Sequence, residues 1–259
     1  MNLPRLIAFD LDDTLAESKS PLTPDMAAAL ADLLALRPVC LISGGQLAQF
    51  TQQVLDRLPA DANLDNLHLM PTCGTRYLRH DHGAWHEVYA HTLPPALREA
   101  AIAALERRAR QLGLWEPDEV VRGERIEDRG SQVTFSALGQ QAAPEAKRAW
   151  DPDGSKRLAL RAAVAADLPH LSVRAGGSTS IDITESGIDK AYGLTSLSQV
   201  TGCPLADMLF FGDRLDEGGN DFPVAQLGVP VCAVAGPADT VVRVRALVAD
   251  LAGGTKEER

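Results

Sequence analysis

The stretch Leu6-Ile7-Ala8-Phe9-Asp10-Leu11-Asp12-Asp13-Thr14 decides the fold. Its first four residues form a short apolar run, which is typical of a buried β-strand. The carboxylates of Asp10 and Asp12 follow at the end of that strand, where buried charge is costly unless another group compensates it. A Mg²⁺ ion and a phosphoryl group would supply that compensation. We therefore expect Asp10 to be a nucleophile that forms an aspartyl-phosphate, and Asp12 to be the acid/base that protonates the leaving oxygen and then activates water.

The composition limits the classes of function. The chain has 259 residues, of which 35 are acidic and 25 basic, so its formal net charge is −10. This balance argues against general binding to nucleic acid or anionic membranes, which need a positive surface, but it allows a locally positive pocket for a small anion. Together with the carboxylates of Asp10 and Asp12, this makes a small phosphorylated molecule the expected partner. No apolar run approaches the ~20 residues that span a bilayer, and the early carboxylates argue against a secretory signal peptide. The cysteines are widely spaced, as expected for reduced thiols in a cytoplasmic protein: Cys40, Cys73, Cys203 and Cys232.

Strand and helix signals alternate at both ends of the chain and change character in the middle. At the ends we predict strands over 6–9, 39–42, 67–71, 208–211 and 229–234, helices over 24–36, 46–58, 189–200 and 239–251, a hairpin around 79–83, and a polar tail over 253–259. In the middle we predict helices over 95–112 and 155–166 with antiparallel strands over 131–136, 171–175 and 178–184. The fold class is therefore α/β: a doubly wound, mostly parallel, Rossmann-like core over residues 1–82 and 188–259, with an inserted α+β domain over residues 83–187.

Further polar residues follow the other predicted parallel strands, where open α/β sheets place their sites. Ser43 and Gly44 follow the second strand, and their hydroxyl and backbone N–H suit phosphoryl oxygens. Lys190 opens the helix after the insert and supplies a positive charge to the same oxygens and to Asp10. Asp10, Asp213 and the backbone carbonyl of Asp12 offer the hard oxygen ligands that Mg²⁺ prefers. Asp221 is a further candidate for the metal site, with a role in shaping its glycine-rich loop as the alternative.

These motifs, in this order, resemble the four motifs of the haloacid dehalogenase-like (HAD) superfamily. The motifs are Asp10-x-Asp12-x-Thr14, Ser43, Lys190 and Gly212-Asp213. The position of the insert resembles the type IIB cap of that superfamily. Gly218-Gly219-Asn220-Asp221 and the segments 122–139 and 176–190 are most similar to the eukaryotic-type phosphomannomutase and sugar-phosphate phosphatase branch. The resemblance implies Mg²⁺-dependent phosphoryl transfer.

Candidate substrate residues lie mainly in the insert. Period-two alternation places Ser180 and Asp182 on one face of their strand, and a hydroxyl beside a carboxylate suits sugar hydroxyls. Arg129 suits a phosphate or carboxylate through its planar fork. The resemblance assigns the same roles to these three residues and adds Lys19 as a basic substrate-binding residue. The alternatives are an exposed strand face for the first two and a surface ion pair for Arg129.

Three departures from the family pattern bear on the reaction. Gln140 stands where phosphomannomutases have a second arginine of the cap, Lys19 replaces an arginine, and Asp13 replaces the glycine of the first motif. A mutase must bind a bisphosphate in two orientations, so a missing arginine favours simple hydrolysis. We therefore predict a phosphohydrolase that acts on a sugar phosphate. The alternatives are a phosphomannomutase-type isomerase and a non-catalytic protein that binds a phosphorylated ligand.

Overall fold

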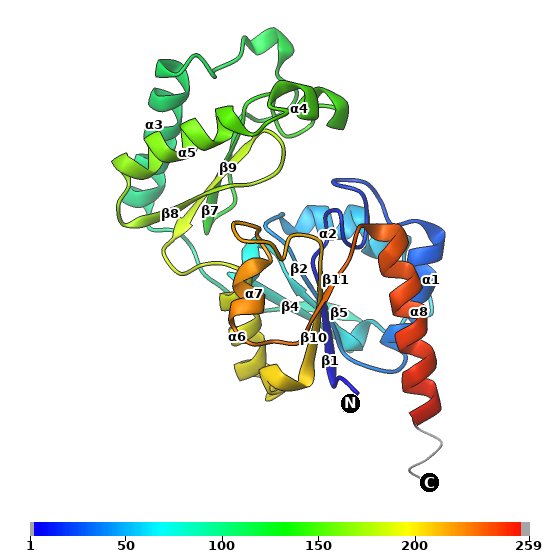
Figure 1. Cartoon of the computed structure of the whole chain (residues 1–259). Helices are drawn as coiled ribbons and strands as arrows, with labels where there is room; N and C mark the ends of the chain where they lie inside the picture. The colour runs from blue at the N-terminus through cyan, green and yellow to red at the C-terminus, as the bar shows by residue number, and fades with distance from the viewer. Residues whose placement is uncertain (1–2, 255–259) are drawn as a thin grey trace. The chain divides into compact units, whose positions relative to one another are not determined.

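The structure is a computed structural model that describes residues 3–254, and it divides into two compact units. The core unit is built from both ends of the chain, up to Ala90 and again from Asp189. The insert unit is the continuous segment His91–Ile188, drawn in green to yellow in Figure 1. Most of the predicted polar tail, from residue 255 onward, lies outside the described residues.

The core unit contains one seven-stranded sheet with the order β11-β10-β1-β2-β3-β4-β5. Its strands are β1 (Leu6–Phe9), β2 (Val39–Ile42), β3 (Leu67–Met70), β4 (Arg76–Asp81), β5 (Ala84–Ala90), β10 (Met208–Gly212) and β11 (Val231–Ala233). The strands from β11 to β3 run parallel, and β4 and β5 continue the sheet as an antiparallel hairpin. This arrangement confirms the mostly parallel sheet that the sequence predicts.

Helices cover both faces of the core sheet (Figure 1). They are α1 (Pro24–Leu34), α2 (Leu47–Gln53), α6 (Lys190–Thr201), α7 (Phe222–Gln226) and α8 (Pro237–Gly254). Because side chains alternate along a strand, Ile7 and Phe9 of β1 pack with α1 and α8, whereas Leu6 and Ala8 pack with α6 and α7. The doubly wound architecture therefore follows from a strand that is apolar on both faces.

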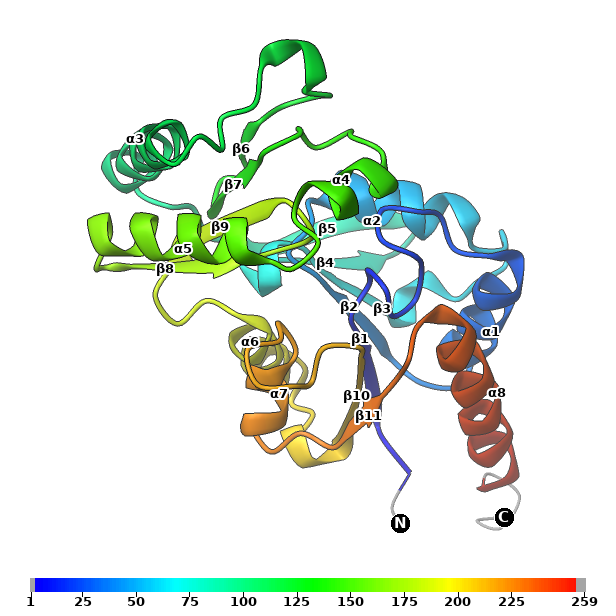
Figure 2. The ribbon, with the colours of Figure 1, turned by 45° about the horizontal axis from the view of Figure 1, so that its top comes forward.

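The insert unit packs helices against one face of a four-stranded antiparallel sheet with the order β6-β7-β9-β8 (Figure 2). Its elements are α3 (Pro95–Gln111), β6 (Ile126–Asp128), β7 (Gln132–Ser136), α4 (Pro144–Trp150), α5 (Ser155–Asp167), β8 (Leu171–Ala175) and β9 (Ser180–Glu185). Phe135, Ile181 and Ile183 point from this sheet into a core that α3 and α5 complete. The opposite face of the sheet is polar.

Short 3₁₀ turns connect several of these elements. They cover Leu55–Arg57, Leu64–Asn66, Thr72–Gly74, Asp118–Val120 and Leu205–Asp207. The predicted helix over 46–58 therefore ends early, because α2 stops at Gln53 and a 3₁₀ turn follows. Within residues 3–254, none of the helices combines the length and the apolarity that crossing a bilayer requires.

The boundaries of the insert differ from the expected 83–187. The strand β5 lies in the core sheet, because it pairs with β4 from Arg76↔Ala90 to Asp81↔Ala84. A boundary at residue 83 would cut this hairpin at its turn. The second unit therefore begins at His91, and at its other end it stops at Ile188, one residue later than expected.

Candidate active site

The candidate nucleophile forms part of a buried charge cluster. Asp10 directly follows β1, and Lys190 is the first residue of α6, whose N-cap Asp189 accepts a hydrogen bond from Tyr192 N–H. The ammonium of Lys190 donates hydrogen bonds to Asp10 Oδ1 and, at 2.6 Å, to Asp221 Oδ1. Each of the three charged residues is at most 2% exposed. The structure thus brings together three residues that are up to 211 positions apart in the sequence.

Burial and charge act in opposite directions on the pKa values of this cluster. Burial raises the pKa of Asp10 to about 8, although the charge of Lys190 pulls it down. Burial lowers the pKa of Lys190, but the carboxylates of Asp10 and Asp221 outweigh it, so that the pKa lies above its ordinary value. Lys190 therefore stays an ammonium at neutral pH. Asp10 needs further positive charge close by to be fully ionised.

A third carboxylate completes a site that fits a divalent cation. Asp213 follows β10, and one oxygen each of Asp10, Asp213 and Asp221 lie within 4.8 Å of one another. Burial and the neighbouring Asp221 raise the pKa of Asp213. The hydroxyl of Thr14 lies 3.4 Å from Asp10 Oδ2 and 3.3 Å from Asp213 Oδ1, between the two carboxylates. Three carboxylates beside one ammonium leave an excess of negative charge, which a hard cation such as Mg²⁺ would neutralise.

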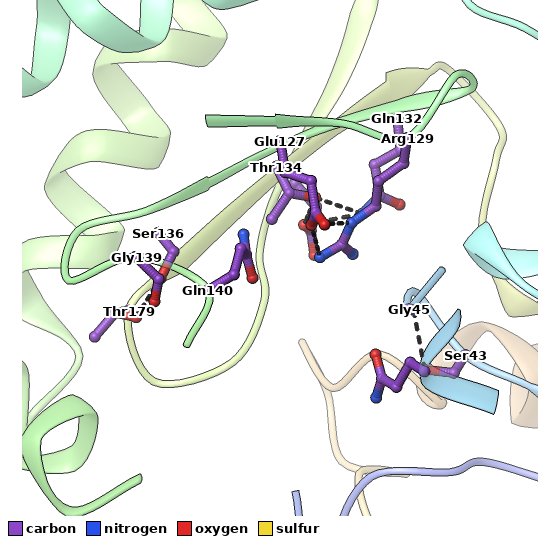
Figure 3. Close-up of polar contacts among 12 residues, drawn as sticks. Ser43, Gly45, Glu127, Arg129, Gln132, Thr134, Ser136, Gly139, Gln140 and Thr179 are labelled. Atoms are coloured by element: carbon purple, nitrogen blue, oxygen red, sulfur yellow. Dashed lines mark hydrogen bonds and ion pairs between the residues drawn. The ribbon is translucent and has the colours of Figure 1, made fainter. Parts of the chain in front are cut away.

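Ser43 and Gly44 lie at the end of β2, as the sequence predicts. Ser43 is 4% exposed, and its Oγ accepts a hydrogen bond from Gly45 N–H at 3.1 Å (Figure 3). Its backbone carbonyl accepts from Cys73 N–H at 2.9 Å. Thr72 and Cys73 have φ angles of 50° and 56°, in the left-handed region that non-glycine residues rarely adopt. The turn after β2 is therefore held in place by a strained turn after β3.

Asp12 lies in the loop between β1 and α1, and its carboxylate is anchored by neighbours within the core unit. Asp12 Oδ1 accepts the backbone N–H of Lys19 at 2.8 Å, and Oδ2 accepts Gln49 Nε2 at 2.8 Å. Asp13 has a φ of 61°, in the left-handed region that favours glycine. Lys19 also has a positive φ, of 58°. Gln49 was not predicted from the sequence, because an uncharged side chain on an amphipathic helix carries no chemical signal.

The predicted substrate residues of the insert unit share its polar sheet face. Across the sheet, Glu127 pairs with Thr134, Thr134 with Asp182, and Asp182 with Arg174, so these four lie in one row on one face. Ser180 lies on the same face of β9, two residues from Asp182, as its alternation predicts. Asp182 Oδ1 accepts hydrogen bonds from Thr134 Oγ1 at 2.7 Å and from Gln132 Nε2 at 3.0 Å.

Arg129 is paired within the insert unit. Its guanidinium contacts Glu127 Oε2 through Nε at 2.7 Å and through Nη2 at 2.6 Å (Figure 3). The side chains of Arg129 and Glu127 are 9% and 21% exposed. This ion pair was one of the two interpretations of Arg129, although the pair is largely buried rather than at the surface. Gln140, also drawn in Figure 3, follows Gly139 beyond the end of β7.

The chain was compared with known protein families and with solved structures. The family model described as eukaryotic phosphomannomutase matches residues 117–250, just over half of the chain. The phosphomannomutase of Spinacia oleracea is 25% identical over 227 residues, covering 85% of this chain and 86% of that protein. Phosphomannomutase 1 of Homo sapiens is 25% identical over 252 residues, covering 93% and 90%.

Solved structures show the same fold at low sequence identity. An IMP-bound, N-terminally truncated IMP-nucleotidase of Plasmodium falciparum superposes with a TM-score of 0.68 at 12% identity, covering 95% of this chain and 68% of that one. A haloacid dehalogenase-like hydrolase of Bacteroides thetaiotaomicron gives a TM-score of 0.61 at 14% identity, covering 94% and 99%. With the family model and the relatives above, these findings place the chain in the HAD superfamily, and within it the chain belongs to the eukaryotic phosphomannomutase family.

Proposed function

We propose that this protein is a Mg²⁺-dependent phosphohydrolase that acts on a sugar phosphate through an aspartyl-phosphate on Asp10. The observation that carries the proposal is the buried cluster of Asp10, Lys190 and Asp221, with the half-buried Asp213 beside it, at the carboxyl end of parallel strands. Such a concentration of charge destabilises a fold. A role in phosphoryl transfer would account for it, because that reaction depends on positioning and electrostatic stabilisation. The free thiols support a cytoplasmic location.

The reaction would proceed in two steps. A carboxylate oxygen of Asp10 bonds to phosphorus while the bond from phosphorus to the sugar oxygen breaks, and Asp12 gives its proton to that leaving oxygen. Asp12 then takes a proton from water, whose oxygen attacks phosphorus and releases Asp10 with inorganic phosphate. The Ser43 hydroxyl and Gly44 N–H would donate to phosphoryl oxygens, and Lys190 would neutralise their charge. Mg²⁺ held by Asp10, Asp213, Asp221 and the Asp12 carbonyl would supply additional positive charge and keep Asp10 ionised.

The insert unit would select the substrate. Asp182, oriented by Thr134 and Gln132, and Ser180 would bind sugar hydroxyls, with Lys19 of the core unit as a further substrate-binding residue. Arg129 would bind a distal anionic or polar group of the substrate, in competition with Glu127. Because Arg129 is already neutralised and Gln140 is uncharged, binding a second phosphate here is less favourable than in a site with two unpaired arginines. This charge balance favours a monophosphate and hydrolysis.

A second candidate is a phosphomannomutase-type isomerase. The family match and the names of the relatives favour it, because they cover most of the chain. This reaction would use the same Asp10 chemistry, but the phosphoryl group would return to a sugar hydroxyl instead of passing to water. It would need a hexose bisphosphate as activator.

The test is phosphate release with Mg²⁺ from a panel of sugar phosphates, including mannose 1- and 6-phosphates, with Asp10→Asn as control. Steady release that Asp10→Asn abolishes is the expected result. Isomerisation of the mannose phosphates in the presence of a hexose bisphosphate, without net release, would replace the hydrolase with the mutase. Absence of both reactions, together with a melting temperature raised by phosphorylated ligands, would make the protein a non-catalytic binder.

A further inference from the structure

Gln49 contacts the candidate acid/base without belonging to any of the four motifs. It lies in α2, directly after the turn that carries Ser43 and Gly44, and its side chain is half-buried. Its Nε2 donates to Asp12 Oδ2 at 2.8 Å, while Lys19 N–H donates to Oδ1 at 2.8 Å. Gln53 Nε2, one helical turn further along α2, lies at 3.5 Å from Oδ1 and bonds Ser20 O at 2.7 Å instead. Gln49 therefore makes the closest side-chain hydrogen bond to this carboxylate that the structure gives.

The turn after β2 fixes the side chain of Gln49 in this orientation. A Cβ atom added at Gly45 would lie only 2.1 Å from Gln49 Oε1, so the amide packs directly against the backbone of that turn. With Oε1 on the side of Gly45, the NH₂ group faces Asp12, where it meets an acceptor. The backbone N–H of Gln49 also donates to Gln46 O at 2.9 Å, which anchors the start of the helix. The side chain thus links the predicted phosphate-binding turn to the predicted acid/base.

We propose that Gln49 is a positioning residue, which holds the carboxyl group of Asp12 in the orientation for proton exchange with the leaving oxygen and with water; this inference rests on the proposed function. An aspartate side chain rotates about two bonds, and a misplaced acid loses much of its effect. Donors on both oxygens restrict that rotation. A carboxylate has about four lone-pair sites, so two donors still leave a site for the transferred proton.

The variant Gln49→Met tests the proposal, because it keeps the length of the side chain and removes the donor. A sugar phosphate needs a proton on its leaving oxygen, whereas 4-nitrophenyl phosphate releases a stable anion without one. We expect kcat/KM for the sugar phosphate to fall about 10- to 50-fold and that for 4-nitrophenyl phosphate to fall less than about threefold. Gln52→Met, an exposed glutamine of the same helix, is the matched control and should leave both values unchanged.

A double-mutant cycle separates positioning from a structural role. In an Asp12→Ala background, Gln49→Met should have no further effect on the sugar phosphate, because it would act through a group that is gone. Equal losses on the two esters, additive losses in the cycle, or unchanged kinetics of Gln49→Met would each overturn the assignment of Gln49 while the proposed function stands. If the wild-type chain transferred no phosphoryl group from either ester, the proposed function would fail and the positioning role with it.

Discussion

The two units of the molecule handle left-handed backbone differently. In the described part of the insert unit, every residue with a positive φ is a glycine: Gly113, Gly123, Gly130, Gly139, Gly154 and Gly187. The core unit also places side chains in this region, at Asp13, Lys19, Thr72, Cys73 and His82. The first four of these belong to the turns that hold Asp12 and Ser43. Backbone strain of about 1–3 kcal/mol per residue is thus tolerated beside the predicted phosphoryl site and avoided in the insert.

The same division applies to charge. The core unit buries two carboxylates around one ammonium, each of them at most 2% exposed, in an arrangement that keeps excess negative charge out of water. On the polar sheet face of the insert unit, Arg129 pairs with Glu127, whose side chain is 21% exposed. The cluster in the core unit therefore carries an unbalanced buried charge that lowers stability, whereas the polar face of the insert is close to neutral.

The largest expected effect is on the core cluster. Lys190→Met would leave Asp10 and Asp221 buried without a counter-ion, and we expect the free energy of unfolding to fall by about 3–5 kcal/mol in the presence of a chelator. Arg129→Met should cost less, about 1–2 kcal/mol, because the side chain of Glu127 is 21% exposed and keeps part of its contact with water. Urea unfolding followed by circular dichroism measures both. Equal losses in the two variants would remove the contrast between the units.

Substitutions at residues with a positive φ test the first difference between the units, which is that the insert unit uses glycine there and the core unit also uses other residues. Gly139→Ala places a Cβ atom 2.2 Å from the carbonyl oxygen of Arg122 at a φ of +85°, and we expect a loss of about 2–3 kcal/mol. Asp13→Gly relieves strain but loses the hydrogen bond from Ser18 N–H, so the net change should stay within about 1 kcal/mol. Gly177→Ala, with no atom within 4 Å of the added Cβ, is the control in the insert unit. A costly Asp13→Gly together with a harmless Gly139→Ala would contradict the comparison.

Acid should weaken the core unit through His68, a buried histidine that is destabilised when it is protonated. Burial, with a smaller contribution from Arg79, lowers the pKa of His68 to about 4, and its Nδ1 contacts the Tyr77 hydroxyl at 2.7 Å. The ordinary pKa is 6.5, so the unfolded chain binds more protons between these values. The contribution of His68 to stability is therefore present above pH 6.5 and is lost as the pH falls toward 4, amounting to about 2–3 kcal/mol at pH 4.5.

The double variant His68→Leu/Tyr77→Phe removes both partners and keeps the site apolar. In urea unfolding, its free energy of unfolding should depend less on pH between 7 and 4.5 than that of the wild type, by about 2–3 kcal/mol. A pH dependence as steep as the wild type's would show that other groups cause the acid sensitivity.

The smallest expected effect sharpens the contrast in charge. Gln140→Arg adds a cation to the insert unit, and we expect KM for a hexose bisphosphate to fall about 3- to 10-fold, which corresponds to the net free energy of one ordinary hydrogen bond, about 0.7–1.4 kcal/mol. Gln141→Arg adds the same charge at the exposed neighbouring position and should change KM by less than about twofold. Similar effects of the two variants would indicate a general field rather than a contact at position 140.

The strands of the fold were largely predictable from the sequence. The strands β1, β2 and β8 occupy the predicted residues, because each is a short run in which most apolar side chains are buried. The strand β6 was missed, since Ile126–Asp128 is three residues long and carries two acids. The short helices α4 and α7 were missed for a similar reason. A few residues give too little periodicity to separate a helix from a loop.

The residues of the predicted site were less evenly predictable. Carboxylates at strand ends are conspicuous, and the structure gathers Asp10, Asp213 and Asp221 around Lys190. The partner of Arg129 could not be foreseen, because Glu127 reaches it only through the bend between β6 and β7. Gln49 carries no charge, so only the folded structure reveals its contact with Asp12. The sequence pattern therefore reveals the charged groups that are unfavourable to bury. The neighbours that orient those groups are set by the tertiary fold and are not visible in the sequence.

The order of the core sheet has a consequence for the nascent chain. The first strand, β1, lies in the interior of the sheet, where Leu6 pairs with Met208, and Lys190 follows Asp10 by 180 residues. At a synthesis rate of ~5–20 residues per second, Lys190 is added on the order of ten to forty seconds after Asp10, the carboxylate that it neutralises. The insert unit is continuous in sequence and is fully synthesised before that lysine. The insert unit, which is predicted to select the substrate, is thus synthesised completely before Lys190 of the predicted phosphoryl-transfer site.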